Sequence, residues 1–184
     1  SNSGIDRIQI YVKEKPRTLV SHIGTGRHYN INSKSGRLQI LFTDSDQRNN
    51  IYNTDIASYY ENMECIEEMH HPYVVITPDY MVYTADFSKL IEQHIQSEAD
   101  ITLLYHAVDN AKDAYLNCNI LNLNKQKGVL SIEPNHGNAK NRNIFMDTYI
   151  MKKDLFIELI RKAKAISSAF TLILNAFCTT IPLK

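Results

Sequence analysis

The chain has 184 residues, of which 43% are hydrophobic and 22% charged, so it is long and apolar enough for one folded domain with a packed core. Lysine plus arginine and aspartate plus glutamate number 20 each, and the formal net charge is zero. This balance argues against a general binder of nucleic acids or of membrane surfaces, because both kinds of binder depend on a basic excess.

The cysteines and the N-terminus indicate the cellular compartment. Cys65, Cys118 and Cys178 are scattered, odd in number and without metal-ligand spacing, which is typical of reduced cytoplasmic thiols. The first residues lack the apolar segment of a signal peptide. We therefore expect a cytoplasmic protein.

The first third of the chain alternates predicted strands and helices. Residues 7–13 and 37–42 favour strands, residues 17–23 favour a short helix, and residues 54–69 carry apolar side chains at helical intervals. After the first helix, residues 24–27 read Gly-Thr-Gly-Arg. This is a weak phosphate-loop signal because the third glycine is missing, and a helix cap is the better explanation.

The central predicted strand is the apolar, mostly β-branched run of residues 73–76. Such a run is typical of a parallel strand that is buried on both faces. Pro78 has no amide hydrogen, so the strand ends before it and Asp79 is left at the carboxyl end. Ligands of open α/β sheets bind outside these strand ends. Asp79 is therefore a candidate ligand or metal residue, and the alternative is a turn-forming aspartate after proline.

The remaining elements continue the alternation. Asp86 is expected to cap a helix over residues 87–96, and Asp154 a helix over residues 154–165. Strands are expected at residues 100–105 and 144–151, and a hairpin joins residues 115–124 to residues 128–132. Residues 135–143, rich in asparagine, glycine and histidine, predict an exposed, mobile loop.

Taken together, the pattern predicts an α/β fold with a three-layer, mostly parallel, Rossmann-like sheet and helices on both faces. Residues 1–165 would form this domain. Residues 166–184 form an apolar C-terminal tail of unclear role, too short and too mixed to span a membrane.

Six segments together suggest a family. They are residues 3–7, residues 21–27, the strand end at residues 75–79, the pair Asp86-Phe87, the helix-to-strand segment at residues 94–102 and the strand at residues 146–150. In this order they resemble ADP-glucose pyrophosphorylase, also called glucose-1-phosphate adenylyltransferase. The resemblance is greatest to the D-type subunit of glycogen biosynthesis, a diverged, non-catalytic partner of the catalytic C-type subunit. It implies a GT-A-like sugar nucleotidyltransferase domain that is incomplete at its N-terminus, because the family's Gly-rich loop would precede residue 3.

The chain departs from the catalytic members of that family at several positions. The family's Ser-Gly-Asp-His strand end has Pro78 in place of its glycine and Tyr80 in place of its histidine. Thr54-Asp55-Ile56 stands where the family has Gly-Thr-Ala, and Glu133-Pro134 lacks the lysine that holds the sugar phosphate. The resemblance leaves Asp79 as the candidate Mg²⁺ ligand, and Asp79 with Tyr80 as candidate substrate-binding residues. No residue is assigned a catalytic role.

Adenylyl transfer needs cations that neutralise phosphate charge and a carboxylate that holds Mg²⁺. Three hypotheses follow from the resemblance and its departures. The chain is a regulatory or structural partner of the catalytic C-type subunit, or an active adenylyltransferase whose missing parts lie outside this chain, or a non-enzymatic binder of ATP or ADP-glucose. An oligomer is expected for the full-length form, and neither nucleic acid nor membrane is expected as a partner.

Overall fold

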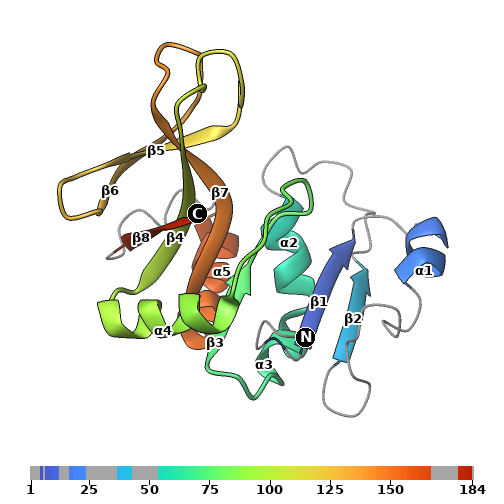
Figure 1. Cartoon of the computed structure of the whole chain (residues 1–184). Coiled ribbons are helices and arrows are strands. Elements are labelled where there is room, and N and C mark those ends of the chain that lie inside the picture. Colours follow the sequence, from blue (N-terminus) through green and yellow to red (C-terminus); the bar gives the residue numbers. More distant parts are fainter. Residues whose placement is uncertain are drawn as a thin grey trace. The chain divides into compact units, whose positions relative to one another are not determined.

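The computed structural model describes residue 5 and residues 7–12, 17–23, 37–42, 54–166 and 178–183. The chain divides into two compact units (Figure 1). The first contains residues 1–70, 86–88 and 156–173, and the second contains residues 71–85, 89–155 and 174–184. The expected glycine-containing cap at residues 24–27 and most of the expected C-terminal tail lie outside the described residues. The division into a domain of residues 1–165 and a tail stays a prediction.

The first unit opens with the expected strand, helix and strand. β1 (Arg7–Val12) and β2 (Arg37–Phe42) pair in parallel along their whole length. A parallel pair requires a crossover rather than a tight turn, and α1 (Arg17–Ile23) lies within that crossover. The three predicted elements are confirmed.

The predicted helix over residues 54–69 is instead two helices, α2 (Thr54–Glu61) and α3 (Met63–Glu67). Asn62 separates them, and its side-chain amide donates to the Ser58 carbonyl at 2.9 Å. Asparagine side chains compete in this way with the backbone hydrogen bonds of a helix. In the same unit, the Tyr59 ring makes edge contacts with Tyr11 at 4.8 Å and with Phe156 at 5.2 Å between ring centroids.

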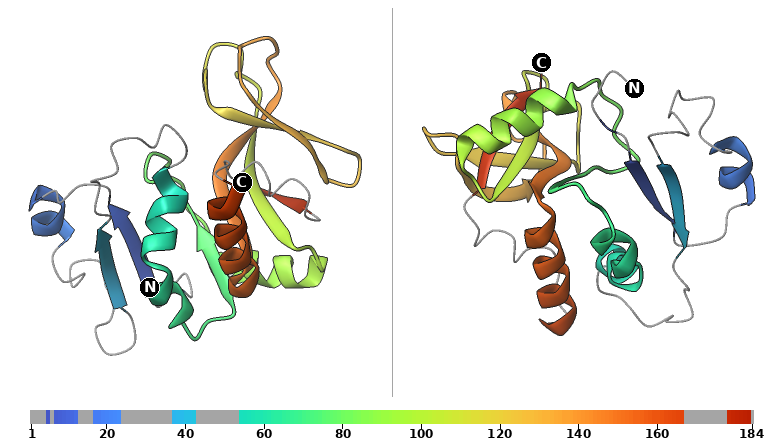
Figure 2. Two further views of the ribbon diagram at one scale, coloured as in Figure 1. Left: turned by 180° about the vertical axis from the view of Figure 1, so that it is seen from behind. Right: turned by 90° about the horizontal axis from the view of Figure 1, so that it is seen from below.

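The second unit is built on a mixed sheet (Figure 2). Strand β7 runs antiparallel to β3, β4 and β5, while β4 and β8 are parallel. Only the pair of β4 with β8 is parallel in the described part of this sheet, and the four other described pairs are antiparallel. The expectation of a mostly parallel sheet was therefore wrong for this unit, because β7 and the β5–β6 hairpin supply antiparallel neighbours. The six strands are β3 (Tyr73–Ile76), β4 (Ile101–Val108), β5 (Asn119–Leu123), β6 (Val129–Pro134), β7 (Arg142–Lys152) and β8 (Cys178–Leu183).

The strand buried on both faces is β4 rather than β3. The first five residues of β4 are all buried, whereas only Val74 of β3 is buried and its other residues are half-buried. The prediction for residues 73–76 was therefore wrong in this respect. The reason is tertiary: β4 lies between β7 and β8, whereas in the described part of the chain β3 pairs with β7 alone.

Two further helices follow β3 and β7 along the chain. α4 (Phe87–Ser97) begins directly after Asp86, as expected, and buries Leu90 and His94. The His94 ring is joined to the Thr102 hydroxyl at 2.7 Å. α5 (Lys153–Ile166) begins one residue earlier than expected, so Asp154 lies in its first turn and is not its cap. None of the described helices is long and apolar enough to cross a bilayer.

The predicted hairpin is confirmed, but the loop after it differs from the prediction. β5 and β6 pair antiparallel, although β5 begins at Asn119 rather than residue 115. Asn135, expected in an exposed loop, is only 2% exposed. Its amide donates to the carbonyls of Ala111 at 2.8 Å, Tyr115 at 3.0 Å and Ala114 at 3.3 Å. The side chain thus satisfies carbonyls of the turn that precedes β5, which holds the start of the loop in place.

Candidate functional site

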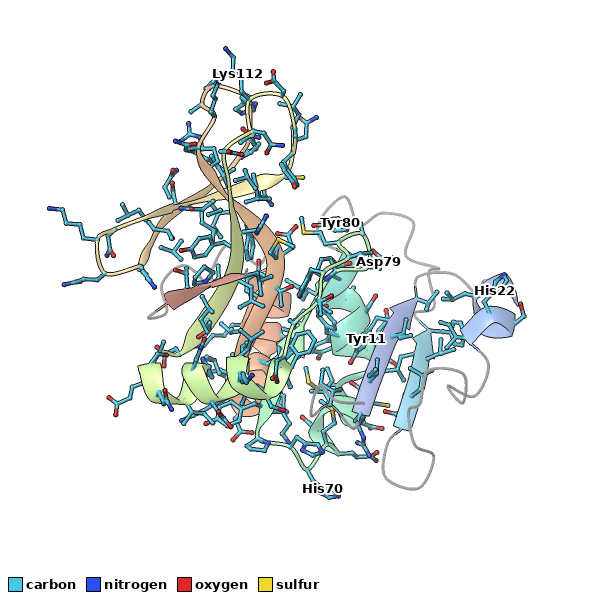
Figure 3. The ribbon with its side chains drawn as sticks, in the orientation of Figure 1. Tyr11, His22, His70, Asp79, Tyr80 and Lys112 are labelled. Carbon is cyan, nitrogen blue, oxygen red and sulfur yellow. The ribbon has the colours of Figure 1, made fainter. Side chains whose placement is uncertain are left out.

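The structure places Asp79 and Tyr80 just beyond the end of β3. β3 ends at Ile76, and Pro78 cannot donate a ladder hydrogen bond, so the chain leaves the sheet there. Asp79 and Tyr80 are labelled in Figure 3. Both side chains are exposed, and Tyr80 is 65% exposed. The predicted position of Asp79 at a strand end is confirmed, and its role in binding a metal or a substrate stays a prediction.

A β-bulge in β7 faces this strand end. Between the pairs Leu103↔Tyr149 and Tyr105↔Phe145, β4 has one residue and β7 has residues 146–148. Asp147, at the centre of the bulge, has a φ of 44°. Left-handed backbone is uncommon for residues other than glycine, although aspartate and asparagine tolerate it best. The Tyr80 hydroxyl donates to the Asp147 carboxylate and so joins the loop after β3 to this bulge.

Three hydroxyl groups make a second connection between the same two segments. The fully buried Thr148 hydroxyl lies 2.7 Å from the Tyr83 hydroxyl and 3.2 Å from the Thr77 hydroxyl. The Tyr83 and Thr77 hydroxyls are themselves 3.2 Å apart, and Thr148 also donates to the Met146 carbonyl at 2.9 Å. The loop after β3 is therefore held against β7 by side chains whose polar groups are mutually satisfied.

The site is acidic. Burial raises the pKa of Asp147 from 3.8 to about 6, because removal from water disfavours the charged carboxylate. Asp79 adds a second carboxyl group, while the loop at residues 77–86 and the bulge at residues 146–148 contain neither lysine nor arginine. These two segments therefore offer hydroxyls and carboxylates but no cation.

The fit to Mg²⁺ is partial. Mg²⁺ is commonly bound through one or two carboxylates together with water and substrate phosphates. Asp79 is exposed and could supply one oxygen, whereas Asp147 accepts a hydrogen bond from Tyr80 and has a raised pKa. Within the described ranges, no three histidine, cysteine, aspartate or glutamate side chains gather as a metal site. Asp79 would thus hold such an ion mainly together with the ligand's own phosphates.

The sequence identified Asp79 and Tyr80 but not their neighbours in space. Asp147, Thr148 and Tyr83 are brought to the strand end by the bulge and by hydrogen bonds spanning 65 to 71 positions of the chain. One local signal was available, because Asp147 interrupts an otherwise mostly apolar strand. A charged residue within such a strand indicates either a bulge or a functional position.

The comparisons with known proteins decide the family. The nucleotidyl transferase family model matches residues 1–175 of this chain. The chain belongs to the nucleotidyl transferase family. This nucleotidyl transferase chain is similar to glucose-1-phosphate adenylyltransferase of Clostridioides difficile (strain 630), with 25% identity over 165 residues, which cover 89% of the chain and 42% of the relative. It is also similar to that of Clostridium perfringens (strain 13 / Type A), with 29% identity over 151 residues, 82% of the chain and 38% of the relative.

The resemblance to glucose-1-phosphate adenylyltransferase is confirmed by these relatives, of which the nucleotidyl transferase chain spans about two fifths of the length. Two crystal structures of HddC from Yersinia pseudotuberculosis are similar in fold. One has a TM-score of 0.70 at 14% identity and covers 98% of this chain and 71% of HddC. The other, complexed with GMP-PN, has a TM-score of 0.72 at 13% identity and covers 99% of this chain and 72% of HddC. They support the predicted Rossmann-like α/β fold.

Proposed function

We propose that the chain belongs to a cytoplasmic, nucleotidyltransferase-like subunit of glycogen biosynthesis that acts as a regulatory, non-catalytic partner of glucose-1-phosphate adenylyltransferase. The observation that carries the proposal is the pairing of Tyr80 with Asp147 beside Asp79. The pair lies beyond the carboxyl end of β3, and ligands of open α/β sheets generally bind outside such strand ends. Its members are an aromatic ring and a carboxyl group, neither of which neutralises a phosphate.

The electrostatics of adenylyl transfer support this proposal. Negative charge develops on phosphate oxygens in the transition state. Its stabilisation by preorganised cations is usually the largest contribution to the rate enhancement. The loop at residues 77–86 and the bulge at residues 146–148 present Asp79 and Asp147 without a lysine or an arginine. At neutral pH these carboxylates repel a polyphosphate instead of stabilising it.

One observation favours the second candidate, an active glucose-1-phosphate adenylyltransferase. Asp79 is exposed and lies three residues beyond the end of β3, so its carboxylate could hold Mg²⁺ bound to a nucleotide. In that case the cations come from elsewhere in the protein, and Asp79 is needed for turnover. The two candidates therefore differ in what Asp79→Asn does.

The test is an assay of ADP-glucose formation from ATP and glucose 1-phosphate with Mg²⁺. The chain is assayed alone, and then mixed with a catalytic glucose-1-phosphate adenylyltransferase subunit. We expect no product from the chain alone, co-elution of the two proteins in size-exclusion chromatography, and a changed rate in the mixture. Asp79→Asn should leave that change intact. ADP-glucose formation by the full-length protein without the catalytic subunit, abolished by Asp79→Asn, would establish the second candidate instead.

A further inference from the structure

A separate cavity lies in the second unit, where β5 and β7 diverge. The described pairing between these strands is confined to Ile120↔Ile144. No backbone pairing of these two strands is described beyond that pair. Residues of β4, β5 and β7 line a cavity of about 1000 Å³ there. The lining includes His106, Asp109, Asn122 and Arg142. None of these residues belongs to the strand-end site around Tyr80.

Arg142 is the unusual member of this lining. Its Nε atom is buried and has no hydrogen-bond partner, and it is the single such side-chain nitrogen or oxygen among the residues that the structure describes. A guanidinium group stays charged and carries five donors in a rigid fork. Leaving a buried donor of a charged group unpaired costs free energy, so the unpaired Nε of an arginine that lines this cavity indicates a missing acceptor.

The side-chain amide nitrogens of two neighbouring asparagines already donate hydrogen bonds within the protein. The Asn122 amide nitrogen donates to Ser131 Oγ and to Glu133 Oε1, both at 2.8 Å. The Asn143 amide nitrogen donates to the Leu121 carbonyl at 3.4 Å. Their oxygens are the groups left to accept hydrogen bonds, and they suit hydroxyl groups or bound water around a ligand.

We propose that this cavity binds a small oxyanion, a phosphate or a carboxylate, with the Arg142 guanidinium as its principal partner. Planar guanidinium groups bind both oxyanions through paired, charge-assisted hydrogen bonds. Asp109 lines the same cavity. Its carboxylate repels a bound anion and so lowers the affinity of the site. The site is distinct from the proposed regulatory function and does not depend on it.

The test titrates the chain with inorganic phosphate and, separately, with citrate at constant ionic strength, by isothermal calorimetry and by thermal unfolding. A saturable response to phosphate alone indicates a phosphate site, and one to citrate alone indicates a carboxylate site. Arg142→Gln should weaken binding about tenfold or more. Arg161→Gln is the matched control, because Arg161 is exposed and pairs with Glu67 at 2.6 Å in α3, and it should leave the affinity unchanged.

A second variant keeps the test decisive if Arg142→Gln fails to fold. Asp109→Asn removes the opposing charge and should tighten binding about threefold, a gain that misfolding cannot produce. The proposal is overturned if neither anion gives a saturable response, which would mean that only water meets Arg142. It is also overturned if Arg142→Gln binds as tightly as Arg161→Gln, or if Asp109→Asn leaves the affinity unchanged.

Discussion

The Asp147→Asn substitution tests the electrostatics of the strand-end site. Burial raises the pKa of Asp147 from 3.8 to about 6. The folded protein therefore holds a proton on this carboxyl group over a pH range in which the unfolded chain has lost it. Because stability falls with rising pH wherever the folded state binds more protons, the wild type should lose stability between about pH 4 and pH 6.

The size of the loss follows from the two pKa values. A difference of about two pH units corresponds to about 3 kcal/mol at ~1.4 kcal/mol per unit. The carboxyl group is only partly buried and accepts a hydrogen bond from Tyr80, which favours its charged form. We therefore expect about 1–2 kcal/mol. Asparagine tolerates the φ of 44° at this position as aspartate does, so Asp147→Asn removes the titration without straining the bulge.

The measurement is the free energy of urea unfolding from pH 3.5 to pH 8. Wild type and Asp147→Asn should have similar stability near pH 4, and the variant should be more stable by about 1–2 kcal/mol above pH 6. Asp113→Asn, at an exposed carboxyl group, is the control for an unspecific loss of negative charge. Parallel curves for wild type and Asp147→Asn, or a wild type that gains stability over the variant as the pH rises, would refute the reasoning.

Two further predictions concern buried polar groups in the second unit. Burial, with a smaller contribution from Lys152, lowers the pKa of His94 below 6.5. As the pH drops through 6.5, the unfolded chain therefore binds a proton at this histidine before the folded protein does, and the wild type should lose stability. Measured by urea unfolding, His94→Gln should lose less stability over the same range. Asn135→Ala should cost about 2–4 kcal/mol, because the carbonyls of Ala111, Ala114 and Tyr115 lose the amide as a donor and, among the described residues, only that of Tyr115 keeps a second one, the Cys118 N–H. The exposed Asn138→Ala should change the unfolding free energy by less than about 0.5 kcal/mol. Equal effects at Asn135 and Asn138 would mean that the amide contributes nothing to the fold.

The secondary structure was largely readable from local patterns. The break at Asn62 has a local cause, whereas the other two errors have long-range causes. The apolar run of β3 and that of β4 look alike in sequence, but β4 is buried because β7 and β8 flank it. The predicted helix over residues 54–69 breaks at Asn62, whose side-chain amide competes with its own backbone N–H for the Ser58 carbonyl. Asn135 reads as a loop residue, and its burial depends on carbonyls 20 to 24 positions earlier.

By itself the sequence determined which segments are strands and helices, the family, and the position of Asp79 after β3, because periodicity, proline and short motifs act over a few residues. Only the tertiary structure decided what surrounds Asp79. The register change between β4 and β7 brings Asp147 to Tyr80 and Thr148 to Tyr83, and the divergence of β5 from β7 opens the cavity beside Arg142. Strand register and divergence depend on the packing of distant segments, which no local pattern in the chain encodes.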